Sequence, residues 1–346
     1  MAFIDDTFSL SLNLKKYNFA KCWYASIKRP PICKNFDRKL KIDMTTLKIA
    51  LDWTPNTNHI GIFVAKQLGY YKEKGIEVEV LNPISDNYQV TPGKKLALGL
   101  ADFAIAPFET VISLNNKKNA VDAIAVFAIL QEDISSIASL KSSKINTPKH
   151  LDGKIYASYK ARYEDHIVKE MVKNNGGTGD LQITYPDKLG IWNTLLEGTA
   201  DATWIFNNWE GVEASTKQIE LNKFSMAQFG IPYCYSPVII ARNSELIAQK
   251  EAYSLFIKAT RKGYLYAANN TAVAANILRE YLTTYDKKNI DIIKSVSITA
   301  PYFGNDTSCG FMNSDRVTVF LECLVAHNLE NKQIIEQHLF TNDLLH

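Results

Sequence analysis

The amino-acid sequence lacks the features that mark several large classes of protein. No apolar run approaches the roughly 18 residues that a membrane-spanning helix requires. The five cysteines are too few and too scattered for a disulfide scaffold. There is no P-loop, no metal-ligand spacing and no Ser–His or Cys–His array, and the six histidines are dispersed. We therefore expect no membrane insertion and no disulfide-stabilised scaffold.

What is present is the composition of an ordinary folded chain. Hydrophobic residues make up 46% of the sequence and charged residues 22%, which is typical of a soluble globular protein and excludes general disorder. At about 150 residues per domain, the 346 residues predict roughly two domains.

The small positive charge of the chain is concentrated at one end. Residues 1–43 hold nine basic and four acidic residues, whereas the remainder holds 30 basic and 32 acidic ones. The body is therefore slightly acidic, so the overall charge of +3 gives no support for a nucleic-acid surface.

Segment 1–43 predicts a disordered or misassigned extension. It contains Pro30-Pro31 and no sustained apolar period, and it lacks the apolar core of a secretory signal. Met44 precedes the first clear strand and is a plausible start. A transit peptide or a docking element remains open. We expect a cytoplasmic protein, with a periplasmic or organellar location as the alternative.

From residue 47 onwards, strand and helix patterns alternate. Short apolar or alternating runs predict strands, and apolar residues at helical spacing predict helices between them. The first set has expected strands at 47–52, 76–80, 102–106 and 123–130 and expected helices at 57–68 and 94–100.

A second set follows the break at Thr147-Pro148. Its expected strands are 154–157, 181–185 and 202–206, its expected helices are 164–174 and 190–197, and helical tracts follow at 244–297 and 313–327. This order predicts an α/β fold of two lobes, each a mostly parallel sheet flanked by helices, with a ligand at the carboxyl ends of the strands. We expect lobe 1 to comprise 44–134 and 236–346, and lobe 2 to comprise 135–235.

The first strand ends in a dense polar and aromatic cluster. Trp53 offers a flat apolar face to a planar ring, and Asp52 and His59 offer polar edges. The helix that follows adds free N–H groups. The competing interpretation is helix capping by Asn56 or Thr57 beside a half-buried tryptophan.

Three further strand ends carry comparable clusters. Phe108 and Glu109 follow the strand at 102–106, where the carboxylate either binds a ligand or caps a helix. After the strand at 154–157, cations at a helix start oppose the dipole, which favours an anionic ligand or a salt bridge over a solvated helix start. The residues concerned are Tyr159, Lys160 and Arg162.

The fourth cluster, after the strand at 202–206, combines indole, amide and carboxyl side chains. It contains Trp204, Asn207 and Glu210, and core packing of Trp204 is the simpler alternative. Tyr235 lies in a Tyr-Cys-Tyr-Ser-Pro stretch that we expect to line the hinge.

With these motifs, residues 47–340 resemble the SsuA/thiamine-pyrimidine family of type II periplasmic-binding-protein folds. The matching stretches are LDWTPNTNHIGIFVAKQLGYYKEKGIEVEV at 51–80, LGLADFAIAPFETVIS at 98–113, LDGKIYASYKARYE at 151–164 and GTADATWIFNNWEG at 198–211. The W-T-P-N-T-N-H run is typical of the branch that handles the aminopyrimidine of thiamine.

The resemblance implies one of two activities. Bacterial members bind formyl-aminopyrimidine thiamine precursors and deliver them to a transporter. Fungal and plant-type members are synthases of hydroxymethylpyrimidine phosphate, which consume pyridoxal phosphate and one of their own histidines, with iron.

Against the synthase motif, this chain has different residues at the reactive positions. The position of the Schiff-base lysine is Ala106, and that of the donor histidine is Thr110. A Schiff base needs an amine, which neither residue has. The phosphate loop aligns with Tyr159–Arg162, and the cysteine cluster is reduced to Cys234.

We therefore predict a protein that binds a thiamine-related aminopyrimidine without chemistry, with no cofactor and no metal. The predicted ligand-binding residues are Asp52, Trp53, Asn56, His59, Phe108, Glu109, Tyr159, Lys160, Arg162, Trp204, Asn207, Glu210 and Tyr235. The expected partners are the small molecule and, if the protein is exported, an ABC transporter permease, for a monomer or homodimer.

Two alternatives stay open. One is a divergent thiamine pyrimidine synthase that uses pyridoxal phosphate and iron with another lysine, such as Lys160. The other is a solute-binding protein for a small anion, such as a sulfonate, held by Lys160 and Arg162.

Overall fold

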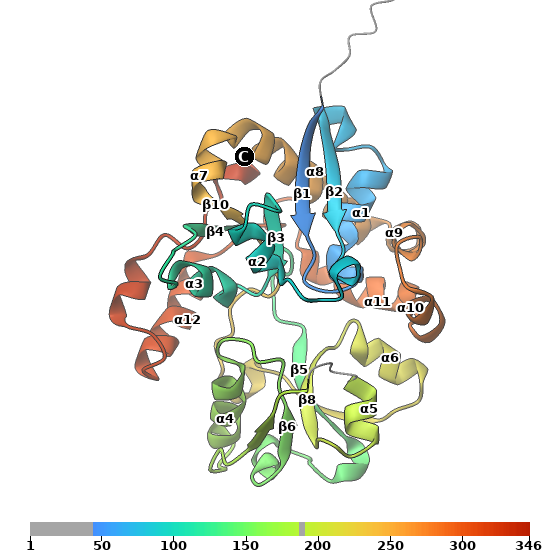
Figure 1. Cartoon of the computed structure of the whole chain (residues 1–346). Helices are drawn as coiled ribbons and strands as arrows, with labels where there is room; N and C mark the ends of the chain where they lie inside the picture. Colours follow the sequence, from blue (N-terminus) through green and yellow to red (C-terminus); the bar gives the residue numbers. More distant parts are fainter. Residues whose placement is uncertain (1–43, 187–190) are drawn as a thin grey trace, which may run out of the picture. The chain divides into compact units, whose positions relative to one another are not determined.

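The computed structural model describes residues 44–186 and 191–346 (Figure 1). The predicted extension at 1–43 and the first residue of the helix predicted at 190–197 lie outside this part. None of the helices in the described ranges is long and apolar enough to cross a bilayer.

The described strands form two five-stranded sheets. The first, sheet A, has the order β2-β1-β3-β10-β4. Its strands are β1 (Thr45–Ala50), β2 (Ile76–Leu81), β3 (Phe103–Ala106), β4 (Ala123–Ala128) and β10 (Val238–Arg242). Strands β3 and β4 are continuous buried runs, as expected for strands covered on both faces, whereas β2 alternates buried Ile76 and Val78 with more exposed glutamates.

Sheet B has the corresponding order β7-β6-β8-β5-β9. Its strands are β5 (Ser135–Leu140), β6 (Ile155–Ala157), β7 (Gln182–Thr184), β8 (Ala202–Phe206) and β9 (Leu221–Phe224). The pairs β6–β7 and β6–β8 are parallel, like β1–β2 and β1–β3 in sheet A. The predicted fold class, two mostly parallel sheets with flanking helices, is confirmed.

Each described sheet is mixed, because one of its strands runs against the others. Strand β10 is antiparallel to β3 and β4, and β5 is antiparallel to β8 and β9. Both are strands that the chain enters directly from the other sheet, without a helical crossover to turn it round. The sequence analysis predicted no strand at 135–140, 221–224 or 238–242.

Helices cover the faces of both sheets (Figure 1). The helix predicted at 164–174 is α4 (Glu164–Asn174), and the tract predicted at 244–297 is divided into five helices. The helices are α1 (Ile60–Gln67), α2 (Pro92–Ala97), α3 (Glu109–Asn115), α4, α5 (Ile191–Leu196), α6 (Glu210–Thr216), α7 (Asn243–Ala248), α8 (Lys250–Asn269), α9 (Thr271–Arg279), α10 (Thr284–Asn289), α11 (Ile292–Thr299) and α12 (Ser314–Ala326).

We call sheet A with its helices lobe 1, and sheet B with α4, α5 and α6 lobe 2. The segment that follows β10 returns to lobe 1, where Phe340 bridges Ala125 and Gly310 bridges Ala128 on β4. Helix α12 therefore belongs to lobe 1, although α4 of lobe 2 lies close to its C-terminal end.

Two glycines allow α1 and α8 to cross at close range in the core of lobe 1. A Cβ atom at Gly263 of α8 would overlap the carbonyl oxygen of Gly61 on α1, and a Cβ at Gly61 would overlap the ring of Tyr264. The Tyr264 hydroxyl donates a 2.6 Å hydrogen bond to the carbonyl oxygen of Asn58, in the segment between β1 and α1. The crossing therefore supports the backbone of the first strand end.

Gly263→Ala tests this crossing. In an unconstrained helix, replacement of glycine by alanine stabilises the helix by about 1 kcal/mol. At a tightly packed crossing, the added Cβ atom instead costs about 1–3 kcal/mol. We expect the free energy of unfolding to fall by about 1–3 kcal/mol in chemical denaturation. Lys258→Ala, at an exposed position of α8, is the control and should change it by less than about 0.5 kcal/mol. A Gly263→Ala variant more stable than the natural protein would contradict the close crossing.

Candidate functional site

A cavity of about 220 Å³ is lined by residues from both lobes. Most of its residues come from the C-terminal end of β8 and from the segments that follow β1 and β3 in sheet A and β6 and β8 in sheet B, where the carboxyl ends of parallel strands meet. The antiparallel strand β10 begins at the same edge, and Tyr233 and Ser236 just before it also line the cavity. The volume lies below the roughly 300–1,000 Å³ of pockets for drug-sized ligands, so it suits a small ligand.

Seven of the thirteen predicted residues line this cavity. They are Asp52, Trp53, Asn56, Glu109, Tyr159, Trp204 and Glu210. Each lies within a few residues of a strand end. This is why the prediction from strand ends selected residues that the fold places around one cavity. Whether they contact a ligand stays a prediction.

His59 supports the cavity from behind and does not line it. The side chain is fully buried, its Nδ1 accepts a hydrogen bond from the backbone N–H of Asn56, and its Nε2 lies 2.7 Å from Oδ1 of Asp52. Because Nδ1 is an acceptor, Nε2 carries the proton and donates it to Asp52. The Asn56 side chain accepts from the N–H of Asn58 and closes a capping box with His59. His59 therefore orients the Asp52 carboxylate.

Aromatic rings supply much of the apolar surface of the cavity. Trp53 of lobe 1 packs on Tyr88, with ring centroids 5.2 Å apart, and Trp204 of lobe 2 packs on Tyr233 at 5.3 Å. Each indole is therefore held by a second ring, a geometry that fixes the plane it presents. Rings from opposite lobes are suited to contact a planar ligand between them.

The carboxyl group of Glu109 is buried with an incomplete set of hydrogen bonds. Oε1 accepts from the Tyr233 hydroxyl at 3.0 Å, whereas Oε2 is buried without a partner. Burial, with smaller contributions from nearby Glu164 and Asp133, raises the pKa of Glu109 from 4.5 to about 7. The group is therefore protonated in part near neutral pH and can donate as well as accept a hydrogen bond.

Two more glutamates contribute carboxyl groups from lobe 2. Glu210 accepts from the backbone N–H of Phe206 at 2.9 Å, and burial raises its pKa to about 7. Glu164 is buried and accepts from the hydroxyl of Tyr156 and the N–H groups of Tyr159 and Ala161, while burial raises its pKa. Glu164 thereby fixes the turn that presents Tyr159.

Among the described residues that line the cavity, none is a lysine or an arginine. The two predicted cations point elsewhere. Lys160 is exposed, with its ammonium 5.4 Å from the ring centroid of Tyr185. Arg162 forms an ion pair with Glu330, which also accepts a 2.6 Å hydrogen bond from Tyr163. Arg162 therefore forms the salt bridge that was one of the two expectations for this helix start. The other expectation was an anionic ligand, and neither of the two cations predicted to bind it lines the cavity.

The other three predicted residues lie outside the lining for reasons of packing. Phe108 is fully buried in the core. The Asn207 amide donates to the carbonyl oxygen of Ile134 and to Ser136, where the chain enters lobe 2. Tyr235 is buried beneath the guanidinium of Arg316, 4.3 Å from its ring centroid.

Nine lining residues were not predicted from the sequence. Most directly adjoin a predicted residue, and Tyr233 begins the Tyr-Cys-Tyr-Ser-Pro stretch that was expected to line the hinge, so a wider window around each predicted residue would have included them. Ile167 gave no such signal. The nine are Asn58, Pro107, Ala161, Glu164, Ile167, Phe206, Trp209, Tyr233 and Ser236. Outside this cavity, the described part of the chain also brings His166, Glu170 and His327 together as a group able to hold a metal ion.

The raised pKa of Glu109 predicts a pH-dependent cost in stability. The folded protein holds the proton of Glu109 up to about pH 7, whereas the unfolded chain loses it near pH 4.5. The contribution of this proton to the free energy of unfolding is therefore fully present below pH 4.5 and is lost as the pH rises through 7. Glu109→Gln removes this titration. We compare the change that the substitution causes in the free energy of unfolding at two pH values. This change should be more favourable at about pH 8 than at about pH 5 by about 2–3 kcal/mol.

Denaturant titration at the two pH values measures this difference. Glu251→Gln, at an exposed position of α8, is the matched control, and it should change the free energy of unfolding equally at the two pH values. An equal effect of Glu109→Gln at the two pH values would show that Glu109 does not titrate near 7.

Comparison with known proteins identifies the family of this chain and supports its fold. The family described as NMT1/THI5 like matches residues 56–274. The formylaminopyrimidine-binding protein of Halalkalibacterium halodurans is 23% identical over 256 residues, which cover 73% of this chain and 74% of that protein. The 4-amino-5-hydroxymethyl-2-methylpyrimidine phosphate synthase of Legionella pneumophila is 25% identical over 242 residues, 68% of this chain and 74% of that protein.

Among solved structures, the alkanesulfonate-binding protein SsuA from Xanthomonas axonopodis pv. citri superposes with a TM-score of 0.65. The match covers 86% of this chain and 99% of that one at 13% identity, so it shows a shared fold alone. The resemblance drawn from the sequence motifs is confirmed. The chain belongs to the NMT1/THI5-like family and has the two-lobed fold of the periplasmic binding proteins.

Proposed function

We propose that this protein binds a thiamine-related aminopyrimidine, such as formyl-aminopyrimidine or hydroxymethylpyrimidine, in the cavity between its lobes. The binding would serve salvage, uptake or biosynthesis of thiamine precursors. The observation that carries the proposal is a small aromatic cavity whose buried carboxyl groups titrate near neutral pH and whose described lining has no cationic side chain.

The hydrogen-bonding pattern of a 4-aminopyrimidine matches Glu109. Its ring nitrogen accepts a hydrogen bond beside an exocyclic amine that donates one. A carboxyl group with one shared proton donates to the first and accepts from the second. Oε2 of Glu109 has no partner in the protein, so a ligand that pairs with it would remove the cost of a buried unsatisfied oxygen. Glu210 is the corresponding candidate on lobe 2.

The rings suit the two faces of the same molecule. Trp53 and Trp204 come from opposite lobes and are each held by a tyrosine. A flat pyrimidine between them buries both faces and gains offset stacking. The name of the Halalkalibacterium relative supports this class of ligand for the family branch.

The cavity does not suit a sulfonate. A sulfonate keeps its negative charge at neutral pH, and here it would meet Asp52, Glu109, Glu164 and Glu210 without a cation among the described lining residues. The predicted cations Lys160 and Arg162 are directed to Tyr185 and Glu330. These contacts support a neutral ligand, or one that carries a proton on its ring.

The names of several relatives raise a synthase as the second candidate. Pyridoxal phosphate requires an amine for its aldehyde and cations or N–H groups for its phosphate. The described lining has no lysine, and Ala106 and Thr110 stand at the two reactive positions of the synthase motif. The residues present do not fit this cofactor, which supports binding without chemistry.

Calorimetry with formyl-aminomethylpyrimidine and hydroxymethylpyrimidine tests the proposal. We expect one site per chain for at least one of them, and no heat with taurine. Trp53→Ala should weaken binding by about 1–3 kcal/mol, because it removes a stacked face. Phe311→Ala, an exposed aromatic residue, is the control and should leave the affinity unchanged. Tight taurine binding without pyrimidine affinity would establish the sulfonate alternative.

Treatment with pyridoxal phosphate distinguishes the binding protein from a synthase. We expect no Schiff-base absorbance beyond that of a surface lysine, and no rescue of a pyrimidine auxotroph grown without precursor. Lys160→Ala tests the lysine suggested for a synthase, and Lys258→Ala, at an exposed position of α8, controls for adventitious reaction at a surface lysine. Rescue together with a Schiff base would replace the binding proposal with the synthase.

A further inference from the structure

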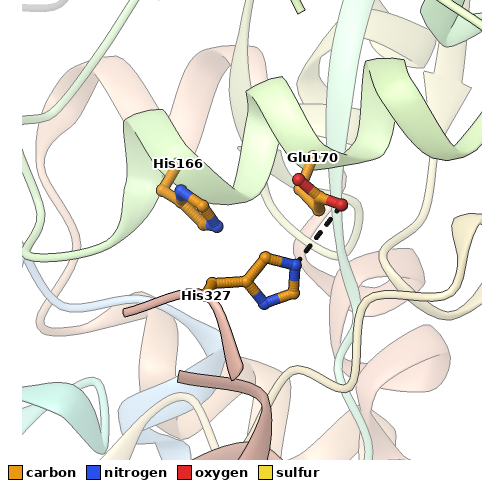
Figure 2. A group of neighbouring side chains, drawn as sticks. All are labelled: His166, Glu170 and His327. Atoms are coloured by element: carbon orange, nitrogen blue, oxygen red, sulfur yellow. Dashed lines mark ion pairs between the residues drawn. The ribbon is translucent and has the colours of Figure 1, made fainter. Parts of the chain in front are cut away.

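A group of two imidazoles and one carboxylate lies between α4 and the end of α12 (Figure 2). His166 and Glu170 are four residues apart and project from the same face of α4, and His327 follows the last residue of α12. One ligand atom from each of the three residues lies within 4.8 Å of the others, and all three side chains are partly buried. This group shares no residue with the lining of the ligand cavity.

The hydrogen bonds of His327 determine which nitrogen faces the other two residues. Its Nδ1 lies 2.8 Å from the carbonyl oxygen of Cys323, which can only accept, so Nδ1 carries a proton and donates it. In the neutral ring, the unprotonated Nε2 then faces Oε1 of Glu170 at 3.4 Å. Two acceptors at this separation repel each other unless a proton or a metal cation lies between them. A backbone carbonyl on the far nitrogen is the usual support of a metal-bound histidine.

His166 supplies a second nitrogen without a competing partner. Its Nε2 is buried and has no hydrogen bond in the described structure, and its ring centroid lies 5.0 Å from that of His327. Burial and the neighbouring His327 lower the pKa of His166 below its usual value, which favours the neutral form that binds metals. Two cations lie near the group: Lys173, 3.5 Å from the other oxygen of Glu170, and Lys169.

We propose that this group binds one divalent transition-metal ion of the zinc class through His166 Nε2, His327 Nε2 and Glu170 Oε1. Two ligands of a tetrahedral zinc ion lie about 3.4 Å apart, which is the separation already present between Glu170 and His327. His166 completes the three-residue set when its nitrogen, now within 4.8 Å of the other two ligand atoms, approaches them to about 3.4 Å, and water fills the fourth position. The Cys323 thiol lies 3.6 Å from Nδ1 of His327, on the opposite edge of the ring, and takes no part.

The position of this group connects the two lobes. Helix α4 belongs to lobe 2, whereas α12 is held on lobe 1 by the contacts of its flanking segments with β4. Ile167, next to His166, lines both the ligand cavity and the small apolar pocket that contains the three residues. An ion at this place would therefore fix the lobes relative to each other beside the ligand cavity, whatever the cavity binds.

Zinc titration of the full chain, stripped of metal beforehand, tests the site by calorimetry without any pyrimidine present. We expect His166→Ala and His327→Ala each to weaken zinc binding by more than about tenfold. The matched control is His150→Ala, an exposed histidine of lobe 2 outside the group, which should bind zinc as the natural protein does. His166→Gln and His327→Gln repeat the test if either alanine variant unfolds.

Equal zinc affinity in the natural protein, His166→Ala and His327→Ala would overturn the site and leave the protonated His327–Glu170 ion pair as the explanation of this geometry. So would the absence of any zinc binding.

Hydrogen–deuterium exchange tests the connection between the lobes. Zinc should slow exchange in α4 and in residues 323–330 of the natural protein. The His327→Ala variant keeps His166 and Glu170 but lacks the ligand from lobe 1. In this variant, the slowing of exchange by zinc in each of the two segments should be at most about a tenth of that in the natural protein. Protection confined to α4 in the natural protein would overturn the bridge between the lobes. These outcomes do not depend on the pyrimidine, so they stand apart from the test of the proposed function.

Discussion

The Glu109 carboxyl group is buried at the cavity with one hydrogen bond from the protein, donated to its Oε1 by Tyr233 at 3.0 Å. This constraint determines the chemistry of the site. Burial makes the charged form costly and raises the pKa to about 7, while the unpaired Oε2 remains to be satisfied. A ligand that shares a proton with this group removes both costs. Since Glu109 starts α3 and Tyr233 precedes β10, the pair also joins lobe 1 to the segment through which the chain returns from lobe 2.

Other polar contacts join the two lobes directly. The Asn208 side chain of lobe 2 donates to Oδ1 of Asn58 at 2.9 Å and to the Thr299 hydroxyl at 3.0 Å, both in lobe 1. Glu330 of lobe 1 accepts from Arg162 and Tyr163 of lobe 2. Contacts that bury polar groups between packed elements, as those of Asn208 do, are costly to break singly. They link the two lobes that line the cavity.

The sequence was sufficient to predict the residues of the site that follow apolar strands. Asp52, Glu109 and Glu210 come just after such runs, and carboxyl ends of parallel strands share one edge. It was insufficient wherever a residue's partner is distant. Nothing near Arg162 in the sequence indicates Glu330, so an anionic ligand and a salt bridge both remained open for Arg162. His166 and His327 meet only through the packing of α4 and α12, and their sole local signal was the four-residue spacing of His166 and Glu170.

The affinity for formyl-aminomethylpyrimidine as a function of pH tests the central claim most directly. In the proposed complex one proton is shared between Glu109 and the ring, whereas the free protein loses it above about pH 7. The account predicts that affinity falls above this pH by up to about tenfold per unit. It also predicts that Glu109→Gln, whose amide pairs with the same two ring groups but does not titrate, removes most of this dependence. An affinity that rises with pH, or a profile that the substitution leaves unchanged, would contradict the account.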